Sequence, residues 1–180
     1  MATHLEIGVG QDRTSAYGDA KNIPLGEGDL FVTLDLKKQI GSLANQDIAL
    51  GPFRSEDREL RSSAFNYVPM YGDGRRIPLA DKSVDEVVLG NVVGDVMVGA
   101  RMISAILNDS LRVIKDGSEI IIRETYTPDV AEEHLKYFMD HHPKGVKLRE
   151  LELTDPRLAS FARKGLSDRF WAIYSYSELR

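Results

Sequence analysis

The stretch Leu5-Glu6-Ile7-Gly8-Val9-Gly10 decides the fold of this chain. It begins as a short apolar run and ends in two glycines that are one residue apart. In a β-strand, Leu5 and Ile7 fall on one face and can be buried, while Gly8 and Gly10 permit a sharp turn and a close approach of the backbone to a ligand. The stretch therefore predicts a first strand and a ligand-binding loop, although a plain tight turn has the same pattern.

The composition around this stretch limits the class of protein. The chain has 180 residues, 42% of them hydrophobic, with no cysteine and a formal net charge of -5. We expect a single domain over residues 1–180, with an adequate core and neither disulfides nor thiolate metal sites. An acidic chain lacks the basic surface that sequence-independent nucleic-acid binding needs. No apolar run reaches membrane-spanning length and no signal-like segment precedes the first strand, so we expect a cytoplasmic protein that binds neither membranes nor nucleic acid.

Strands and helices alternate along the rest of the chain. Further strands are predicted at 30–35, 67–71, 84–89, 120–122, 146–153 and 170–176, and helices at 37–50, 55–66, 102–115 and 127–139. At most a short helical turn fits at 12–17, and Pro69 places the third strand at a sheet edge or weakens it. This order predicts an α/β fold in which helices cover both faces of a mostly parallel sheet.

Glycines and polar side chains follow the first four predicted strands. Asp35 ends the second strand, Asp73 follows the third and Asn91 follows the fourth. Ligands of parallel sheets bind at these ends, near the point where the strand order reverses. A carboxylate such as Asp35 can accept two charge-assisted hydrogen bonds from a vicinal diol. Singly, each residue has a simpler interpretation, because Asp35 and Asn91 can cap helices and Asp73-Gly74 can be an ordinary turn.

Three blocks together resemble the class I S-adenosylmethionine-dependent methyltransferases of the type 11 kind. They are Leu-Glu-Ile-Gly-Val-Gly at 5–10, Gly-Asp-Gly-Arg-Arg-Ile-Pro-Leu-Ala-Asp-Lys-Ser-Val-Asp-Glu-Val-Val-Leu at 72–89, and Leu-Arg-Val-Ile-Lys-Asp-Gly at 111–117. The second is similar to the family's GDA-x-x-LPF-x-D-x-SFD segment and the third to its LRVLKPGG helix end. The resemblance implies a Rossmann-like, seven-stranded, mostly parallel sheet whose last strand is antiparallel.

The resemblance also implies S-adenosylmethionine as the cofactor. The candidate cofactor-binding residues are Glu6, Gly8, Gly10, Asp35, Asp73, Gly74 and Asn91. The first three would line the pocket for the methionine and ribose parts, and Asp35 would accept hydrogen bonds from the ribose hydroxyls. Asp73 would accept from the adenine amino group, with the Gly74 N–H near a ring nitrogen. Asn91 would lie near the sulfonium and the acceptor.

Neither the acceptor nor a general base is identified by these blocks. Tyr126, Glu124 and Asp95 lie near predicted strand ends and are candidates for contact with the acceptor. An Asn-Pro-Pro-type motif is missing because Val92-Val93 follows Asn91, which disfavours methylation of DNA adenine or of glutamine. We therefore expect an S-adenosylmethionine-dependent methyltransferase with a small-molecule acceptor and leave its catalytic residues unassigned.

Three alternatives compete with this interpretation. A Rossmann oxidoreductase fits less well, because Arg13 stands at the third glycine position and no hydride-chemistry pair is apparent. The pair His141-His142 lacks a third ligand nearby, so we expect no metal site. A non-catalytic, methyltransferase-like binding module is the main competitor, since the first loop departs from the family pattern.

That departure concerns the chain after Gly10. The family's third glycine is absent, and Gln11-Asp12-Arg13 leads into a glycine- and proline-containing stretch. The sequence also begins directly at the first strand, without the N-terminal helices that commonly cover the cofactor. Three arrangements remain open: the 11–28 loop folds over the ligand, a second protomer in a homodimer closes the site, or the pocket stays open.

Overall fold

A single sheet forms the centre of the molecule. The computed structural model describes residues 1–8, 16–17, 22–35, 66–141, 145–161 and 167–175. Its strands are β1 (Thr3–Ile7), β2 (Leu30–Asp35), β3 (Asn66–Tyr71), β4 (Glu86–Gly90), β5 (Glu119–Glu124), β6 (Val146–Leu151) and β7 (Arg169–Ser175). They form a seven-stranded sheet in the order β3-β2-β1-β4-β5-β7-β6. β7 runs antiparallel to its neighbours β5 and β6, and the other pairs are parallel, which confirms the predicted sheet.

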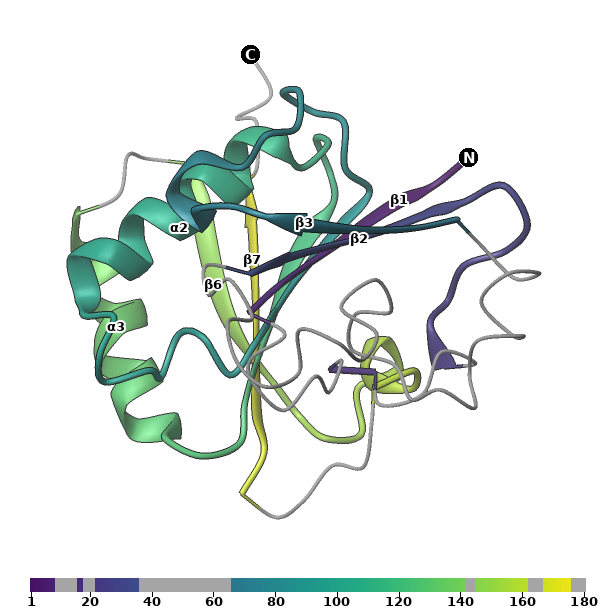
Figure 1. Ribbon diagram of the computed structural model, residues 1–180. Helices are drawn as coiled ribbons and strands as arrows, with labels where there is room; N and C mark the ends of the chain where they lie inside the picture. The colour runs from purple at the N-terminus through teal and green to yellow at the C-terminus, as the bar shows by residue number, and fades with distance from the viewer. Residues whose placement is uncertain (9–15, 18–21, 36–65, 142–144, 162–166, 176–180) are drawn as a thin grey trace, which may run out of the picture.

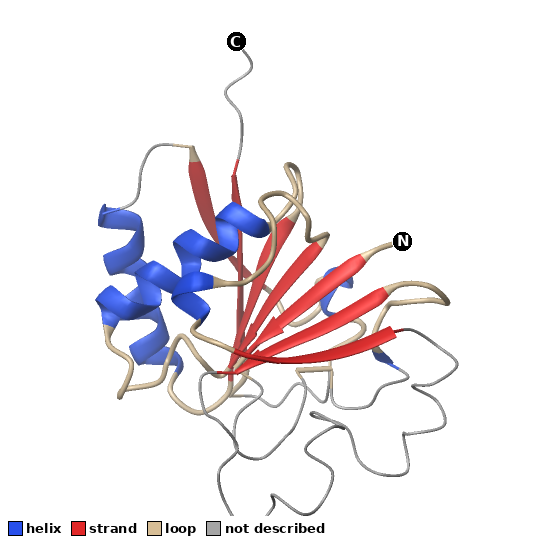
Figure 2. Ribbon diagram, turned by 45° about the horizontal axis from the view of Figure 1, so that its top comes forward, coloured by secondary structure: helices blue, strands red, loops and turns tan. Residues whose placement is uncertain are grey.

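Two helices cover one face of this sheet. α2 (Ala100–Val113) and α3 (Pro128–His141) lie side by side against it in both views (Figures 1 and 2). The strands contribute every second residue to this face, for example Leu5 and Ile7 of β1. From α2, Ile103, Ile106 and Leu107 are fully buried, because apolar residues at three- and four-residue spacing fall on one side of a helix. The predicted helices at 102–115 and 127–139 are thus confirmed.

An aromatic cluster fills the opposite face. It includes Tyr17, Phe31, Phe161 and Phe170, all buried. The Tyr17 ring stacks on Phe161 with 4.9 Å between centroids, and the chain near Phe161 forms the 3-10 helix η5 (Pro156–Leu158). The predicted helices at 37–50 and 55–66 lie outside the described residues, as does most of the predicted turn at 12–17. Of that turn, Ala16 and Tyr17 are described, and both are in a turn.

Among the described strands, β3 forms an edge of the sheet and pairs with β2 alone. Pro69 lies within it, opposite Thr33. Because proline has no N–H to donate, an edge position is where a strand tolerates it, as the sequence predicted. None of the helices in the described part of the chain is long and apolar enough to cross a lipid bilayer.

Candidate functional site

The strand order reverses between β1 and β4, and Gly8 lies at this point. The chain passes from β1 to β2 on one side, whereas β4 and β5 lie on the other. Gly8 has a φ of +83°, and its N–H donates to the Leu34 carbonyl oxygen at 3.0 Å. A Cβ on Gly8 would lie 1.7 Å from Cγ2 of Val92. Glycine is therefore required here both by the left-handed backbone and by the close packing of Val92.

Glu6 lies two residues before Gly8, in β1, and is buried, with 1% of its surface exposed. Its Oε1 accepts a hydrogen bond from the Ala16 N–H at 2.5 Å. The carboxylate thus holds the chain where it returns to the sheet after Gly8. Gly10, another candidate cofactor-binding residue, lies outside the described residues.

Asp35 is the last residue of β2, next to the end of β1. The parallel register pairs Ile7 with Leu34 and Asp35 with Tyr71, so the backbone of Asp35 lies one residue beyond the last paired residue of β1. This places Asp35 at the same end of the sheet as Gly8. The position agrees with the prediction, while its side chain is outside the described part of the structure.

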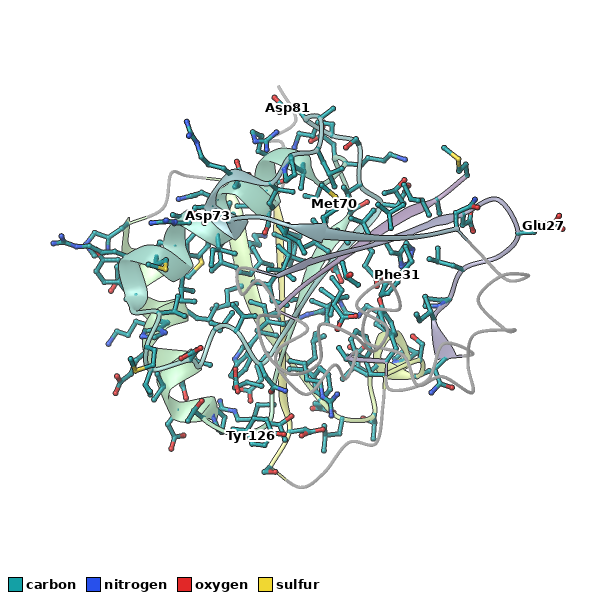
Figure 3. The ribbon with its side chains drawn as sticks, in the orientation of Figure 1. Glu27, Phe31, Met70, Asp73, Asp81 and Tyr126 are labelled. Atoms are coloured by element: carbon teal, nitrogen blue, oxygen red, sulfur yellow. The ribbon has the colours of Figure 1, made fainter. Side chains whose placement is uncertain are left out.

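Asp73 follows β3 and caps the 3-10 helix η4 (Gly74–Arg76). Its Oδ1 accepts from the Arg75 N–H at 2.9 Å, and the Arg75 guanidinium donates to both carboxylate oxygens. Hydrogen bonds from the Arg75 side chain lower the pKa of Asp73 below its ordinary value, so the carboxylate is ionised at neutral pH. Figure 3 places Asp73 beyond the end of β3, beside α2.

Gly74 is buried directly against α2. A Cβ on Gly74 would lie 3.4 Å from Cγ1 of Ile106 and 3.6 Å from Cγ2 of Ile7. The backbone after β3 therefore lies close to the core formed by α2 and β1.

The loop after η4 is fixed to α2 by Asp109 and Arg112. Ile77 N–H donates to Asp109 Oδ2 at 2.5 Å, and Arg112 Nη2 donates to the Ile77 carbonyl oxygen at 2.8 Å. Arg112 Nη1 also donates to the Leu79 carbonyl oxygen at 2.9 Å. Two of the sequence blocks, 72–89 and 111–117, are thus joined in space. Arg112 of the second of these blocks binds the backbone of the first.

Asn91 follows β4 and ties its end to the end of β5. It has a φ of +55°, and its N–H donates to the Arg123 carbonyl oxygen at 2.8 Å. Its side-chain Oδ1 accepts from the Thr125 N–H, also at 2.8 Å. Asn91 therefore lies at the predicted strand end, where its side-chain amide oxygen is bound by the Thr125 N–H.

A second set of hydrogen bonds joins the same two loops. Gly94 N–H donates to Glu124 Oε2 at 2.9 Å, and Thr127 Oγ1 donates to the Gly94 carbonyl oxygen at 2.7 Å. Glu124 is 1% exposed, so its carboxylate faces the two loops and not the solvent. Asp95 Oδ1 accepts from the Met97 N–H at 2.8 Å.

Tyr126 differs from the other two candidates for contact with an acceptor. It is 76% exposed and projects at the lower margin of Figure 3. Of Tyr126, Glu124 and Asp95, it is the one whose side chain is freely accessible. Among the described residues, no group of three or more His, Cys, Asp or Glu is arranged to hold a metal ion.

Sequence reasoning missed the residues that hold this end of the sheet together. Ala16, Gly94 and Thr127 stand in no recognisable motif. Arg123 and Asp168 form an ion pair at 3.1 Å in which the side chains are 12% and 1% exposed. The sequence did contain one indication of this ion pair. Arg123 directly follows Ile120-Ile121-Ile122, a predicted buried strand, and a buried charge needs a partner.

Comparisons with known proteins add to this geometry. No family sequence model matches the chain, and no curated protein is significantly similar in sequence. Solved structures are similar. An arsenic (III) S-adenosylmethionine methyltransferase from Chlamydomonas reinhardtii, CrArsM, has a TM-score of 0.52 at 16% identity, over 96% of this chain and 62% of that chain. An S-adenosylmethionine-dependent methyltransferase structure from Methanococcus maripaludis has a TM-score of 0.56 at 17% identity, over 99% and 79%.

TrmN from Thermus thermophilus extends the comparison, with a TM-score of 0.59 at 15% identity. The match covers 97% of this chain but 44% of TrmN. This chain therefore spans less than two thirds of the length of CrArsM and of TrmN. At these identities the similarity concerns the fold. The chain has the class I S-adenosylmethionine-dependent methyltransferase fold.

Proposed function

We propose that this protein binds S-adenosylmethionine at the carboxyl ends of β1 to β4 and transfers its methyl group to a small-molecule acceptor. The observation that carries the proposal is Gly8. It directly follows β1 where the strand order reverses, has a left-handed backbone, and adjoins the strand that ends in Asp35. Such a position is where open α/β sheets bind ligands.

The proposed ligand groups suit the cofactor chemically. An aspartate at position 35 would accept hydrogen bonds from the ribose diol. Asp73 is ionised, and a carboxylate has about four lone-pair sites, so it can accept from the adenine amino group while Arg75 remains bound. The Gly74 N–H would lie near the adenine ring, and Glu6, Gly8 and Gly10 near the methionine part.

The chemistry that follows requires alignment above all. When bound, S-adenosylmethionine supplies a methyl group on a sulfonium sulfur, which keeps the electron pair of the broken bond when a nucleophile takes the methyl. Holding donor and acceptor in line is a large part of catalysis in such a transfer. The hydrogen bonds from Thr125 to Asn91 and from Gly94 to Glu124 support this role, because they join the loops after β4 and β5 beside the proposed sulfonium position.

One acceptor class is disfavoured by composition. The solved structure from Chlamydomonas reinhardtii is described as an arsenic (III) methyltransferase. Trivalent arsenic is a soft centre that thiolates bind, and this chain has no cysteine. We therefore propose an organic acceptor with an O, N or C nucleophile.

A non-catalytic binding module is the second candidate. It is favoured by the hydrogen bonds that three of the proposed cofactor-binding side chains already make within the protein. Glu6 already binds Ala16, Asn91 binds Thr125, and Asp73 binds Arg75. The sequence after Gly10 also lacks the family's third glycine. In this alternative the fold serves assembly, and the cofactor does not bind.

Isothermal titration calorimetry with S-adenosylmethionine and S-adenosylhomocysteine separates the two candidates. The enzyme proposal expects binding by the wild type and a loss of about 1.5–3 kcal/mol in Asp35→Ala, the value for a hydrogen bond to a charged acceptor. Asp116→Ala is the matched control, because Asp116 is exposed and pairs with Lys82 on the surface. If the wild type shows neither heat of binding nor a thermal shift at millimolar ligand, the enzyme proposal is contradicted. If Asp35→Ala binds with unchanged affinity, Asp35 does not bind the ribose.

A further inference from the structure

The loops that follow β4 and β5 carry exposed apolar side chains. In the described part of the chain, the exposed large hydrophobic residues are Met1, Val68, Val96, Met97, Tyr126 and Leu153. Val96 and Met97 lie in the loop between β4 and α2, and Tyr126 lies in the loop between β5 and α3. We call Val96, Met97 and Tyr126 the apolar rim. Burial of these side chains against a ligand is favourable, because it removes apolar surface from water.

The two loops that carry the apolar rim are in direct contact. Thr127 Oγ1 donates to the Gly94 carbonyl oxygen at 2.7 Å. Val96 and Met97 follow Gly94 closely in the chain, and Tyr126 directly precedes Thr127. Figure 3 places Tyr126 at the lower end of the molecule, where the connection between β5 and α3 lies in Figure 1. The rim therefore belongs to one region of the surface, at the carboxyl ends of β4 and β5.

Described residues also connect the rim to Gly8. Val92 belongs to the loop that carries two of the rim residues, and a Cβ on Gly8 would lie 1.7 Å from Val92 Cγ2. The Val92 carbonyl oxygen accepts from the Asp95 N–H at 3.1 Å, and the Asp95 carbonyl oxygen accepts from the Val98 N–H at 3.0 Å. These two turns lead from the Gly8 contact to the exposed side chains. The rim thus borders the end of the sheet at which we propose that the cofactor binds.

Tyr126 presents its ring from a backbone that is bound on both sides. The N–H of the preceding residue, Thr125, donates to Asn91 Oδ1 at 2.8 Å, and α3 begins two residues later, at Pro128. Asn91 is the residue that we propose to lie near the sulfonium, so Tyr126 follows a direct contact with that position. An aromatic side chain has few rotatable bonds, and its ordering against a ligand therefore costs little conformational entropy. The ring is suited to bind a flat apolar group.

The charged side chains of these loops are carboxylates. Residues 91–99 and 124–128 include Asp95 and Glu124 but no lysine, arginine or histidine. Asp95 Oδ1 accepts from the Met97 N–H at 2.8 Å, so this carboxylate lies within the loop that carries the rim. An anionic group on the acceptor would meet like charge there, without a cation from either loop to offset it, and like-charge contacts oppose binding. The rim therefore favours an acceptor without a negative charge.

We propose that the apolar rim selects an uncharged acceptor with an aromatic ring, which packs on Tyr126 and Met97 while its nucleophile faces the sulfonium beside Asn91. The inference rests on the proposed function and names its substrate class. In the transfer, a lone pair of the nucleophile forms the bond to the methyl carbon. The bond from that carbon to sulfur breaks, sulfur keeps the electron pair, and the proton of the nucleophile leaves to water. Tyr126 sets specificity and takes no proton.

The test measures the binding of a neutral and an anionic aromatic probe to the protein saturated with S-adenosylhomocysteine. Benzyl alcohol and benzoate have the same ring and differ in charge. The methyl NMR signal of Met97, assigned by its loss in Met97→Leu, reports contact with the rim. We expect millimolar benzyl alcohol to shift this signal, and benzoate to bind roughly fivefold more weakly.

Variants of Tyr126 test the contact with the ring. Tyr126→Ala should weaken the binding of benzyl alcohol roughly fivefold, because the aromatic side chain supplies most of the apolar contact area. Tyr126→Phe keeps the ring and should bind within about twofold of the wild type. Val68→Ala is the matched control, since it shortens an exposed apolar side chain on the edge strand β3. All three variants should bind S-adenosylhomocysteine as the wild type does.

The outcomes separate this inference from the proposed function. If the wild type binds S-adenosylhomocysteine but benzyl alcohol leaves the Met97 signal unchanged, the inference is overturned while the proposed function stands. The same conclusion follows if Tyr126→Ala binds benzyl alcohol as tightly as the wild type, or if both probes bind equally well. A wild-type dimer in sedimentation that Tyr126→Ala dissociates would make the rim an interface between two copies and would also overturn it. If the wild type binds neither S-adenosylmethionine nor S-adenosylhomocysteine, both proposals fail together.

Discussion

The Glu124 carboxylate accepts a hydrogen bond from the Gly94 backbone N–H at 2.9 Å and joins the loops that follow β4 and β5. The two residues are also in close steric contact. A Cβ on Gly94 would lie 2.7 Å from Glu124 Cδ and 2.6 Å from the Thr127 carbonyl oxygen. The carboxylate can bind the amide at this distance because position 94 carries no side chain.

The first prediction is that Gly94→Ala destabilises the protein. Overpacking of a well-packed site costs about 1–3 kcal/mol, and here the neighbours are backbone and a buried carboxylate that cannot easily move. Urea unfolding followed by circular dichroism measures the loss. Gly26→Ala is the control, because among the described residues a Cβ there would meet Asp29 Oδ2 alone, at 3.9 Å. Equal stabilities of the two variants would show that the close contact at Gly94 is not rigid.

The second prediction concerns alkaline pH and Tyr17. Burial, together with the charge of Glu86 and the hydrogen bond to it, raises the pKa of Tyr17 well above its ordinary value. The unfolded chain loses this proton near pH about 10, whereas the folded protein retains it. Stability from this group is therefore complete below pH about 10 and falls as the pH rises towards the folded-state pKa.

Tyr17→Phe tests that dependence. The variant loses the hydroxyl bond to Glu86 and should be less stable at neutral pH, by about 1.5–3 kcal/mol for a bond to a charged group. Its stability should also decline less steeply above pH about 10 than that of the wild type. Tyr126→Phe, at an exposed position, should behave as the wild type does. Urea midpoints across the alkaline range provide the comparison, and parallel curves for wild type and Tyr17→Phe would refute the prediction.

The third prediction separates two roles of Asp73. Both Asp73→Ala and Arg75→Ala break the ion pair between these residues. Only the first removes the carboxylate proposed to bind adenine. We expect Asp73→Ala to weaken S-adenosylhomocysteine binding by about 1.5–3 kcal/mol, and Arg75→Ala to change it by less than about 0.5 kcal/mol. Calorimetry decides; equal effects would assign the loss to the geometry of η4 rather than to a hydrogen bond with the ligand.

The fourth prediction is that Arg112 contributes more to stability than an ordinary surface arginine or lysine. Arg112 donates to the carbonyl oxygens of Ile77 and Leu79, and its removal leaves these partly buried groups without that donor. Arg112→Met should cost about 1–3 kcal/mol. Lys82→Met, which breaks an exposed pair with Asp116, should cost about 0–1 kcal/mol. Thermal and urea unfolding of the two variants test the difference.

Much of the fold could be predicted from the sequence because its signals are local. Helix α2 follows from apolar spacing, and β4 and β5 follow from apolar runs that end at polar residues. Pro69 correctly indicated an edge strand, since the absence of an N–H is a property of the residue itself. The 3-10 helix η4 was predicted as loop, because its cap at Asp73 has the same residues as a plain turn.

The site could be predicted less completely, because its contacts join distant positions. The strand ends at Gly8, Asp35, Asp73 and Asn91 were located in the sequence, since each follows an apolar strand. The partners of Glu6 and Asn91 could not be inferred, because Ala16 and Thr125 take part through backbone N–H groups that every residue except proline has. The roles of the predicted cofactor ligands stay predictions until binding is measured.

The position of β7 also affects the order in which the sheet can be completed during synthesis. β7 lies between β5 and β6, and it is the last of the described strands to leave the ribosome. Until it emerges, β6 has no neighbouring strand in the sheet, and β5 exposes one side of its backbone. A nascent chain that ends before Arg169 therefore presents an open edge to chaperones or to other chains. The sheet of such a chain can be completed only once residues 169–175 are available.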